Sequence, residues 1–310
     1  MPRPSPDIDT APSKPAQRLN APPSDFPFSD RDYHRIREIA KSRFGLDLGE
    51  SKRALVYGRL ARRLRALGLP DFASYLALIE DADAAESRCL INALTTNVTH
   101  FFREEHHFDH LGKHLLPSVL RRPPSDRRVR IWSAGCSSGE EPYSLAMVSR
   151  EFLDAAATPT LDLKILATDI DSDVLERART ARYDLGRSTH LTPARVAQHF
   201  ELSPDQGGHA YRVVERTRSL VTFNQLNLLE PWPMRGTFDA IFCRNVMIYF
   251  DRATKMALVR RFAELLRPGG LLFLGHSESL VDPVTSLVGR GKTIYQKDPA
   301  APSRKSVERS

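Results

Sequence analysis

Several polar residues in this sequence come directly after apolar, strand-like segments, where they could bind a ligand. In chain order these residues are Glu140, Glu141, Asp169, Arg244 and Asn245. The carboxyl ends of parallel strands meet at one edge of an α/β sheet, and ligands bind at that edge. The chemistry of these side chains should therefore indicate which ligand the protein binds.

The acidic pair Glu140-Glu141 stands at the expected start of a helix, after the small residues 133–139. Small residues allow a ligand to approach the backbone closely, and the positive end of the helix dipole faces that ligand. Two carboxylates would repel a phosphate and would favour a cationic group such as an amine or a sulfonium. The same acids could also be there only because they stabilise the helix dipole.

Asp169 follows the second strand-like segment, a position where an acid commonly binds the hydroxyl pair of a ribose. A ribose occurs in both NAD and S-adenosylmethionine (SAM). The sequence lacks the G-x-G-x-x-G motif of dinucleotide-binding folds, and the Glu140-Glu141 pair suits a sulfonium, so SAM is favoured. Asp171, two residues further on, could simply cap the next helix.

The elements that position these residues alternate between strands and helices beyond residue 125. The expected strands are 128–134, 163–168, 219–226, 238–243 and 270–275, and the expected helices are 140–156, 171–182 and 252–267. This alternation predicts a parallel sheet that is covered by helices on both faces. Residues 184–218 interrupt the pattern, and HAYRVVERTRSLV within them is predicted to form a short strand pair on an inserted subdomain.

Residues 29–95 are predicted to form a bundle of four helices, with Ser29 capping the first. In the second helix, 51–67, one stripe is apolar; it consists of Leu55, Val56, Leu60, Leu64 and Leu67. The opposite arc is basic and consists of Lys52, Arg59, Arg62, Arg63 and Arg65, while Arg53 falls nearer the apolar side.

The net charge of +7 is concentrated in this helical region. Between residues 31 and 65 there are eleven Lys and Arg against four acids, a surplus as large as that of the whole chain. Such a surplus predicts an acidic partner, either a nucleic acid, an anionic membrane or an acidic protein surface.

Composition narrows the class of protein further. No apolar run approaches the roughly 20 residues of a membrane helix, and the N-terminus has no signal-peptide core, so we expect a cytoplasmic protein without membrane insertion. The three cysteines form no C-x-x-C pair, and the histidines at 100, 106, 107 and 110 match no metal motif. We therefore expect neither disulfides nor a metal site.

Six segments of the sequence carry a recognisable set of motifs: LTTNVTHFFREEHHF (94–108), WSAGCSSGEEPYS (132–144), ATDIDSDVLERA (167–178), FNQLNLLE (223–230), FDAIFCRNVMIYF (238–250) and LLRPGGLLFLGHSESL (265–280). In order and spacing, these motifs resemble the CheR-type chemotaxis receptor methyltransferases over residues 29–297. Cys136 departs from the small inert residue often found in the glycine loop of that family, a change of little volume.

The resemblance implies an α/β fold of the class I SAM-dependent methyltransferase type, with a Rossmann-like sheet and a small β-subdomain insertion, preceded by an all-α domain. The expected organisation is a disordered proline-rich segment (1–28), a helical domain (29–95), a methyltransferase domain (96–297, with the insertion near 184–218) and a flexible tail (298–310). The implied reaction transfers the methyl group of SAM to receptor glutamates, which yields glutamyl methyl esters and S-adenosyl-L-homocysteine.

The resemblance also assigns roles to individual residues. Arg103 and Tyr249 are expected nearest the reacting methyl group, and Glu141 or its neighbour Glu140 is expected to face the sulfonium end. The residues expected to contact the cofactor are Asn97, Thr99, Arg103, Glu141, Asp169, Asn227, Leu228, Arg244 and Asn245. The residues expected to dock the glutamate-rich receptor helices are Arg53, Arg59, Arg62 and Arg63.

The implied chemistry demands little of the protein, because a glutamate carboxylate is already ionised at pH 7. Catalysis then consists of alignment and desolvation, with Arg103 holding the carboxylate through paired N–H donors and Tyr249 orienting it. We expect a monomer, whose inserted subdomain could also bind a receptor C-terminal tail peptide.

Two other functions remain open from the residues alone. A nucleic-acid methyltransferase would suit the pI near 9.4, but the polar-Pro-Pro-aromatic motif of amino-group methylation is missing at 244–249, and the basic face lacks interleaved aromatic residues. A non-catalytic SAM- or receptor-binding module would not need both Arg103 and Tyr249. We therefore expect no nucleic-acid partner.

Overall fold

The computed structural model of the chain describes residues 25–80, 84–95, 97–156, 161–186, 190–203, 210–280 and 286–300. Residues 1–24 of the segment expected to be disordered lie outside the described residues. So do residues 301–310 of the expected tail and the Gly207-Gly208 loop of the insertion.

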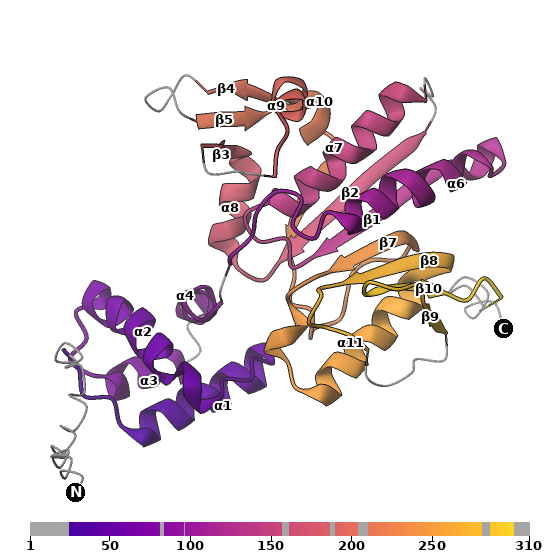
Figure 1. Cartoon of the computed structure of the whole chain (residues 1–310). Helices are drawn as coiled ribbons and strands as arrows, with labels where there is room; N and C mark the ends of the chain where they lie inside the picture. Colours follow the sequence, from indigo (N-terminus) through magenta and orange to yellow (C-terminus); the bar gives the residue numbers. More distant parts are fainter. Residues whose placement is uncertain are drawn as a thin grey trace, which may run out of the picture.

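The first part of the chain is all-helical (Figure 1). It contains α1 (Asp30–Phe44), the 3-10 turn η1 (Glu50–Lys52), α2 (Arg53–Leu67), α3 (Phe72–Glu80) and α4 (Ala84–Leu94). Ser29 begins α1 with a capping box, in which its hydroxyl accepts a hydrogen bond from the Asp32 N–H at 3.1 Å and the Asp32 carboxylate accepts one from the Ser29 N–H at 2.9 Å. This reciprocal pairing satisfies backbone donors that the first helical turn leaves free.

The apolar stripe of α2 is narrower than predicted. Val56, Leu60 and Leu64 are buried as expected, but the exposed fractions of Leu55 and Leu67 are 41% and 36%. Leu55 lies roughly 100° around the helix from Val56, so it points away from the core. Leu67 is the last residue of the helix and extends past the core.

The second part of the chain is built on a seven-stranded sheet of order β6-β2-β1-β7-β8-β10-β9. The strands are β1 (Arg128–Ala134), β2 (Asp162–Asp169), β6 (Val221–Gln225), β7 (Phe238–Cys243), β8 (Leu266–Leu274), β9 (Leu287–Gly289) and β10 (Ile294–Lys297). The five predicted strands are parallel to one another. Two further strands were not predicted: β10 pairs antiparallel with β8, and β9 pairs antiparallel with β10.

Helices cover both faces of the sheet, as the alternation of elements predicts (Figure 1). Along β7, Ala240 and Phe242 pack in one apolar cluster, while Ile241 and Cys243 pack in another. The first cluster includes α5 (His106–His110), the π-helical turn η2 (Leu111–Leu115), α6 (Leu116–Leu120) and α7 (Glu140–Ala155). The second includes α11 (Arg252–Leu265). The remaining elements here are the 3-10 turns η3 (Pro124–Asp126) and η4 (Met247–Tyr249) and helix α8 (Ser172–Thr180).

The insertion is a separate three-stranded antiparallel sheet of order β3-β5-β4. Its elements are β3 (Arg182–Asp184), α9 (Pro193–His199), β4 (Phe200–Leu202), β5 (Ala210–Val213) and α10 (Glu215–Arg218). The predicted strand pair within HAYRVVERTRSLV is wrong, since only 210–213 forms a strand of the inserted sheet and 215–218 is helical. The strand partners of β5 come instead from earlier in the chain.

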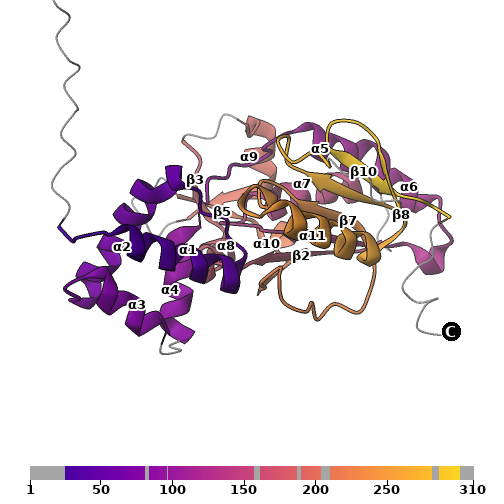
Figure 2. The same ribbon diagram turned by 90° about the horizontal axis from the view of Figure 1, so that it is seen from below.

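The helical part packs against the carboxyl edge of the large sheet (Figure 2). Asp47 donates its backbone N–H to the Tyr249 carbonyl at 2.8 Å, and Lys41 pairs with Asp251 at 3.3 Å. These contacts place the helices over the strand ends that carry the candidate ligand-binding residues. Among the described residues, no helix combines the length and the apolar character needed to cross a bilayer.

Candidate functional site

A cleft of about 950 Å³, open to solvent at its mouth, lies between the helices and the carboxyl edge of the sheet. We call it the interdomain cleft; Phe44, Leu46 and Ile91 form its helical wall. The sequence-predicted residues that line it are Asn97, Thr99, Arg103, Glu141, Asp169, Asn227, Leu228, Arg244, Asn245 and Tyr249. The structure thus brings every predicted cofactor and catalytic position to one cavity.

The loop after β1 approaches the cleft closely because Gly135 has no side chain. Its φ is +87°, and an added Cβ would come within 2.2 Å of the Val246 Cγ2 atom. Ser137, further along the loop, donates its backbone N–H to the Asp169 carboxylate at 2.8 Å. The loop is therefore fixed to the acid at the end of β2.

Asp169 is 8% exposed and its two oxygens are both bonded to backbone N–H groups. One oxygen accepts from Ser137, and the other accepts from Asp171 at 3.0 Å. Burial raises the pKa of this carboxyl to about 6 despite these hydrogen bonds. Asp171 caps α8 by accepting the Asp173 N–H, and it also accepts from the Asn97 amide at 2.7 Å. The position of Asn97 in the cleft thus depends on a helix cap.

Arg244 forms the floor of the cleft as part of a buried ion-pair group. Its guanidinium, 2% exposed, pairs with Glu141 at 2.9 Å and with Glu104 at 3.3 Å, and it donates to the Arg103 carbonyl. The hydroxyl of Ser133 donates to Glu141 at 2.7 Å. Burial raises the pKa of Glu141, while Arg244 and Ser133 act in the opposite direction. Removing one partner of such a pair costs about 3–5 kcal/mol.

Glu140 and Glu141 have different environments. From the sequence, either could be the acid that faces a cationic ligand group, and the structure distinguishes them. Glu141 lines the interdomain cleft. Glu140 accepts a hydrogen bond from the Ser138 hydroxyl at 2.7 Å and lies in a neighbouring hollow beside Tyr183 and His190. Glu141 is therefore the acid placed to face a cationic ligand group in the cleft.

Arg103 stands at the junction of the two parts of the chain, between two residues of unusual backbone conformation. Phe102 and Glu104 have φ of +54° and +56°, a region that residues other than glycine rarely occupy. Arg103 donates to the Val98 carbonyl at 2.8 Å, and within the described residues it makes no ion pair with Glu104 or Glu105. Its charge is therefore available to a ligand.

Tyr249 lies where the helices meet the sheet. Its ring is 5.1 Å from the ammonium group of Lys52, the residue immediately before α2. Sequence reasoning placed Lys52 on the basic arc but gave it no role at the site. Spacing along α2 could not reveal this contact, because it depends on how the two parts of the chain pack.

Glu278 is a site residue that sequence reasoning missed. It is 7% exposed and accepts backbone N–H groups from Gly275 at 2.7 Å, Asn245 at 2.7 Å and Ile248 at 3.1 Å. These bonds hold the segment from Arg244 to Tyr249, in which Asn245 has a φ of +58°. The available signal was a carboxylate three residues after Gly275 in the segment GHSES.

The four arginines predicted to dock a partner differ in their surroundings. Arg53 pairs with Asp30 at 2.6 Å, Arg59 donates to the carbonyls that end α4, and Arg63 pairs with Glu86, which is 3% exposed. Arg62 is exposed. Three of the four therefore stabilise the helical part itself, so Arg62 is the most accessible to a partner.

The fold and the site together define a SAM-dependent methyltransferase. The cleft lies at the carboxyl edge of the parallel sheet, and two acids line it: Asp169 at the end of β2 and Glu141 at the start of α7. Gly135 permits the close backbone approach that such a ligand requires.

Comparison with known proteins identifies the family. Residues 97–292 match the CheR methyltransferase SAM binding domain, and residues 31–95 match the CheR methyltransferase all-alpha domain. The chain therefore belongs to the CheR methyltransferase family, whose activity is that of a SAM-dependent chemotaxis protein methyltransferase.

Three curated relatives support this assignment. The "Probable chemotaxis protein methyltransferase" of Rhizobium etli is 48% identical over 76% of this chain and 87% of the relative. The "Chemotaxis protein methyltransferase" of Salmonella typhimurium is 45% identical over 86% and 90%, and that of Escherichia coli is 44% identical over 86% and 91%. The similarity thus extends over nearly the whole length of these proteins.

Asp169 should make SAM binding dependent on pH. We expect the ionised carboxylate to accept hydrogen bonds from ribose hydroxyls, so that protonation below the pKa of about 6 competes with binding. We predict that SAM affinity is constant from pH 7 to 8 and falls by up to about tenfold per pH unit below 6. Titration calorimetry between pH 5 and 8 measures this. The Asp169→Asn variant should bind weakly and lack the step; an unchanged affinity from pH 7 to 5 in the wild type would contradict the assignment.

Glu278 should be essential for the shape of the cleft. The substitution Glu278→Gln keeps the volume but replaces one acceptor oxygen with an NH₂ group that faces backbone donors, which costs about 1–3 kcal/mol. We predict a lower denaturation midpoint and at least a tenfold rise in the Kd for SAM. Glu264→Gln, at an exposed site on α11, is the matched control. Wild-type SAM affinity in the Glu278 variant would show that these hydrogen bonds do not position the 244–249 segment.

Proposed function

We propose that this enzyme methylates glutamate side chains on the cytoplasmic helices of chemoreceptors, giving glutamyl methyl esters. The observation that supports a carboxylate acceptor is a positive charge in the lining of the interdomain cleft. Arg103 lines the cleft and has no carboxylate partner among the described residues, and Lys52 lies against Tyr249. An amino-group acceptor would not need an arginine without a carboxylate partner.

The protein contributes alignment and desolvation to the reaction. Arg103 binds the incoming carboxylate through paired N–H donors, which directs one carboxylate oxygen toward the methyl group. Tyr249 contacts the acceptor from the side of the helices. The walls of Phe44, Leu46 and Val246 exclude water, so the carboxylate reacts without its hydration shell. The cofactor supplies an electrophilic methyl group on a sulfonium and leaves as S-adenosyl-L-homocysteine.

The remaining predicted residues contact different parts of the cofactor. Asp169 accepts hydrogen bonds from the ribose, and Glu141 faces the sulfonium. Asn227 and Leu228 flank the adenine. Asn97, Thr99, Arg244 and Asn245 complete the wall and floor of the pocket.

Docking of the receptor is proposed for the accessible part of the basic surface. Receptor methylation helices present repeated glutamates, which complement a positive surface. Arg62 is the main candidate, and Arg53, Arg59 and Arg63 support the surface through their contacts within the domain.

We also propose that the inserted sheet binds a receptor tail peptide by strand addition, since β3 and β4 are its edge strands. The enzyme would then act as a cytoplasmic monomer, without a nucleic-acid partner.

The identity of the acceptor is tested with methyl-labelled SAM and receptor-containing membranes. We expect label that is released as volatile methanol by base, which is diagnostic of a carboxyl ester. Arg103→Lys keeps the charge but loses the paired donors, so turnover should fall at least about 100-fold, whereas Arg121→Ala, an exposed residue after α6, should leave it unchanged. Base-stable label on nucleic acid, or no label, would contradict the proposal.

Electrostatic docking is tested separately through KM. We predict that Arg62→Ala raises the KM for receptor by about three- to tenfold with little change in kcat, since one exposed contact contributes about 1 kcal/mol. Added salt should weaken wild-type docking. In contrast, Arg63→Ala should lower the unfolding temperature, because it leaves the buried Glu86 without its partner. A KM that is independent of both salt and Arg62 would refute this docking mode.

A further inference from the structure

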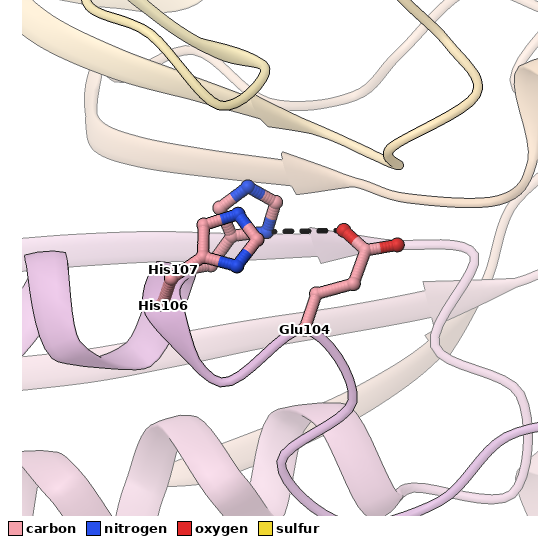
Figure 3. A group of neighbouring side chains, drawn as sticks. All are labelled: Glu104, His106 and His107. Carbon is pink, nitrogen blue, oxygen red and sulfur yellow. Dashed lines mark ion pairs between the residues drawn. The ribbon is translucent and has the colours of Figure 1, made fainter.

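A compact group of potential ligand atoms lies directly behind the floor of the interdomain cleft. Glu104, His106 and His107 each offer one such atom, and the three atoms lie within 4.8 Å of one another. Figure 3 shows the carboxylate of Glu104 facing the ring of His107, with the ring of His106 beside it. The group touches the catalytic machinery through Glu104, but none of the cofactor contacts described above uses either histidine.

His107 is fully buried and one of its nitrogens has no hydrogen-bond partner. Its Nε2 atom lies 3.0 Å from the Lys292 carbonyl oxygen, which can only accept, so Nε2 carries the proton of the neutral ring. The Nδ1 atom therefore presents a lone pair toward Glu104, and this atom accepts no hydrogen bond from the described residues.

The Glu104 carboxylate faces this nitrogen with an oxygen atom that, like the nitrogen, carries a lone pair. Its Oε2 atom lies 3.5 Å from His107 Nδ1 and 3.3 Å from the Arg244 guanidinium, and it accepts no hydrogen bond within the described residues. The other oxygen accepts from the His276 backbone at 3.2 Å and lies 3.0 Å from the His276 ring. Two electron-pair donors thus face each other without a proton between them.

The two neighbouring carboxylates share a single positive charge, so a second cation could bind one of them. Arg244 is shared by two carboxylates, Glu104 at 3.3 Å and Glu141 at 2.9 Å. The shorter contact is to Glu141, and the Arg103 carbonyl also accepts from Arg244. Arg244 can therefore keep two partners if Glu104 takes another.

We propose that Glu104, His106 and His107 bind a divalent transition metal, of which Zn²⁺ is the best match, and that this metal opposes SAM binding. One carboxylate and two imidazoles form a donor set that suits zinc and not magnesium or calcium. Ligand distances of about 2.0–2.2 Å require the three atoms to move closer together. His106 is only half-buried, so its ring can rotate to complete the site.

The metal would act on the cleft through Arg244. A metal on Glu104 withdraws this carboxylate from the guanidinium, so Arg244 loses one of the contacts that fix the floor beneath Glu141. It also adds positive charge behind the position expected for the sulfonium. Because coupling between two sites is reciprocal, bound SAM should weaken zinc binding by the same factor that zinc weakens SAM binding.

Zinc binding is tested with chelator-treated full-length protein and a chromogenic zinc indicator. We expect one saturable site, unaffected by excess Mg²⁺, whose Kd rises at least tenfold in His106→Ala. His106 is preferred to the buried His107 because its removal should not disturb folding, which circular dichroism verifies. His34→Ala, whose side chain is 71% exposed on α1, and Cys89→Ser, which removes a part-buried thiol, are the controls that should bind as the wild type does. Equal zinc affinity in His106→Ala and the wild type would overturn the site.

The proposed effect of zinc on SAM binding is measured separately, without methyl transfer. Calorimetry should show the Kd for SAM rising at least threefold at saturating Zn²⁺ in the wild type but not in His106→Ala. Zinc bound at one site with no change in the Kd for SAM would overturn the antagonism. Neither measurement requires the receptor, so failure here is distinguishable from failure of the proposed acceptor.

Discussion

The buried guanidinium of Arg244 is the interaction on which the catalytic geometry depends. It joins the end of β7 to Glu141 at the start of α7 and to Glu104 and the Arg103 carbonyl in the segment that follows the helices. These three elements are far apart in the sequence, and no strand pairing brings them together. A single positive charge in a medium of low polarity, with acceptors on several sides, fixes the cleft floor and the backbone of Arg103 at once.

Unusual backbone conformations gather around the same floor. Phe102, Glu104, Ser137 and Asn245 all have positive φ values, and each adjoins a residue that lines the cleft or lines it directly. Such conformations persist only where surrounding contacts hold them. The contacts are visible here: Glu278 holds the Asn245 segment, and Arg244 holds the 102–104 segment. Contacts within the protein thus hold these segments, which reduces the free energy that a ligand must spend on ordering them.

Much of this architecture could be predicted from the sequence, because its causes are local. The alternation of apolar runs and helical periods determined the parallel strands, and polar residues at strand ends identified Asp169, Glu141 and Arg244. The antiparallel strands β9 and β10 were missed because they are short. The roles of Arg59 and Arg63 were not predictable from a count of charges, since Glu86 and the carbonyls that end α4 lie outside the basic stretch. Glu278 was missed for a related reason: it binds backbone groups, which leave no pattern in side-chain types.

The junction between the two parts of the chain is more than a connection. Thr95 and Asn97, on either side of the boundary between the two matched family domains, both donate to the Asp171 carboxylate that caps α8. The residues on both sides of the domain boundary therefore also line the interdomain cleft. A chimaera that exchanges the helical domain for that of a relative would have to carry this junction together with the acceptor at the α8 cap. The segment that can be exchanged as a unit is therefore not the helical domain as the family match delimits it, but that domain together with the junction.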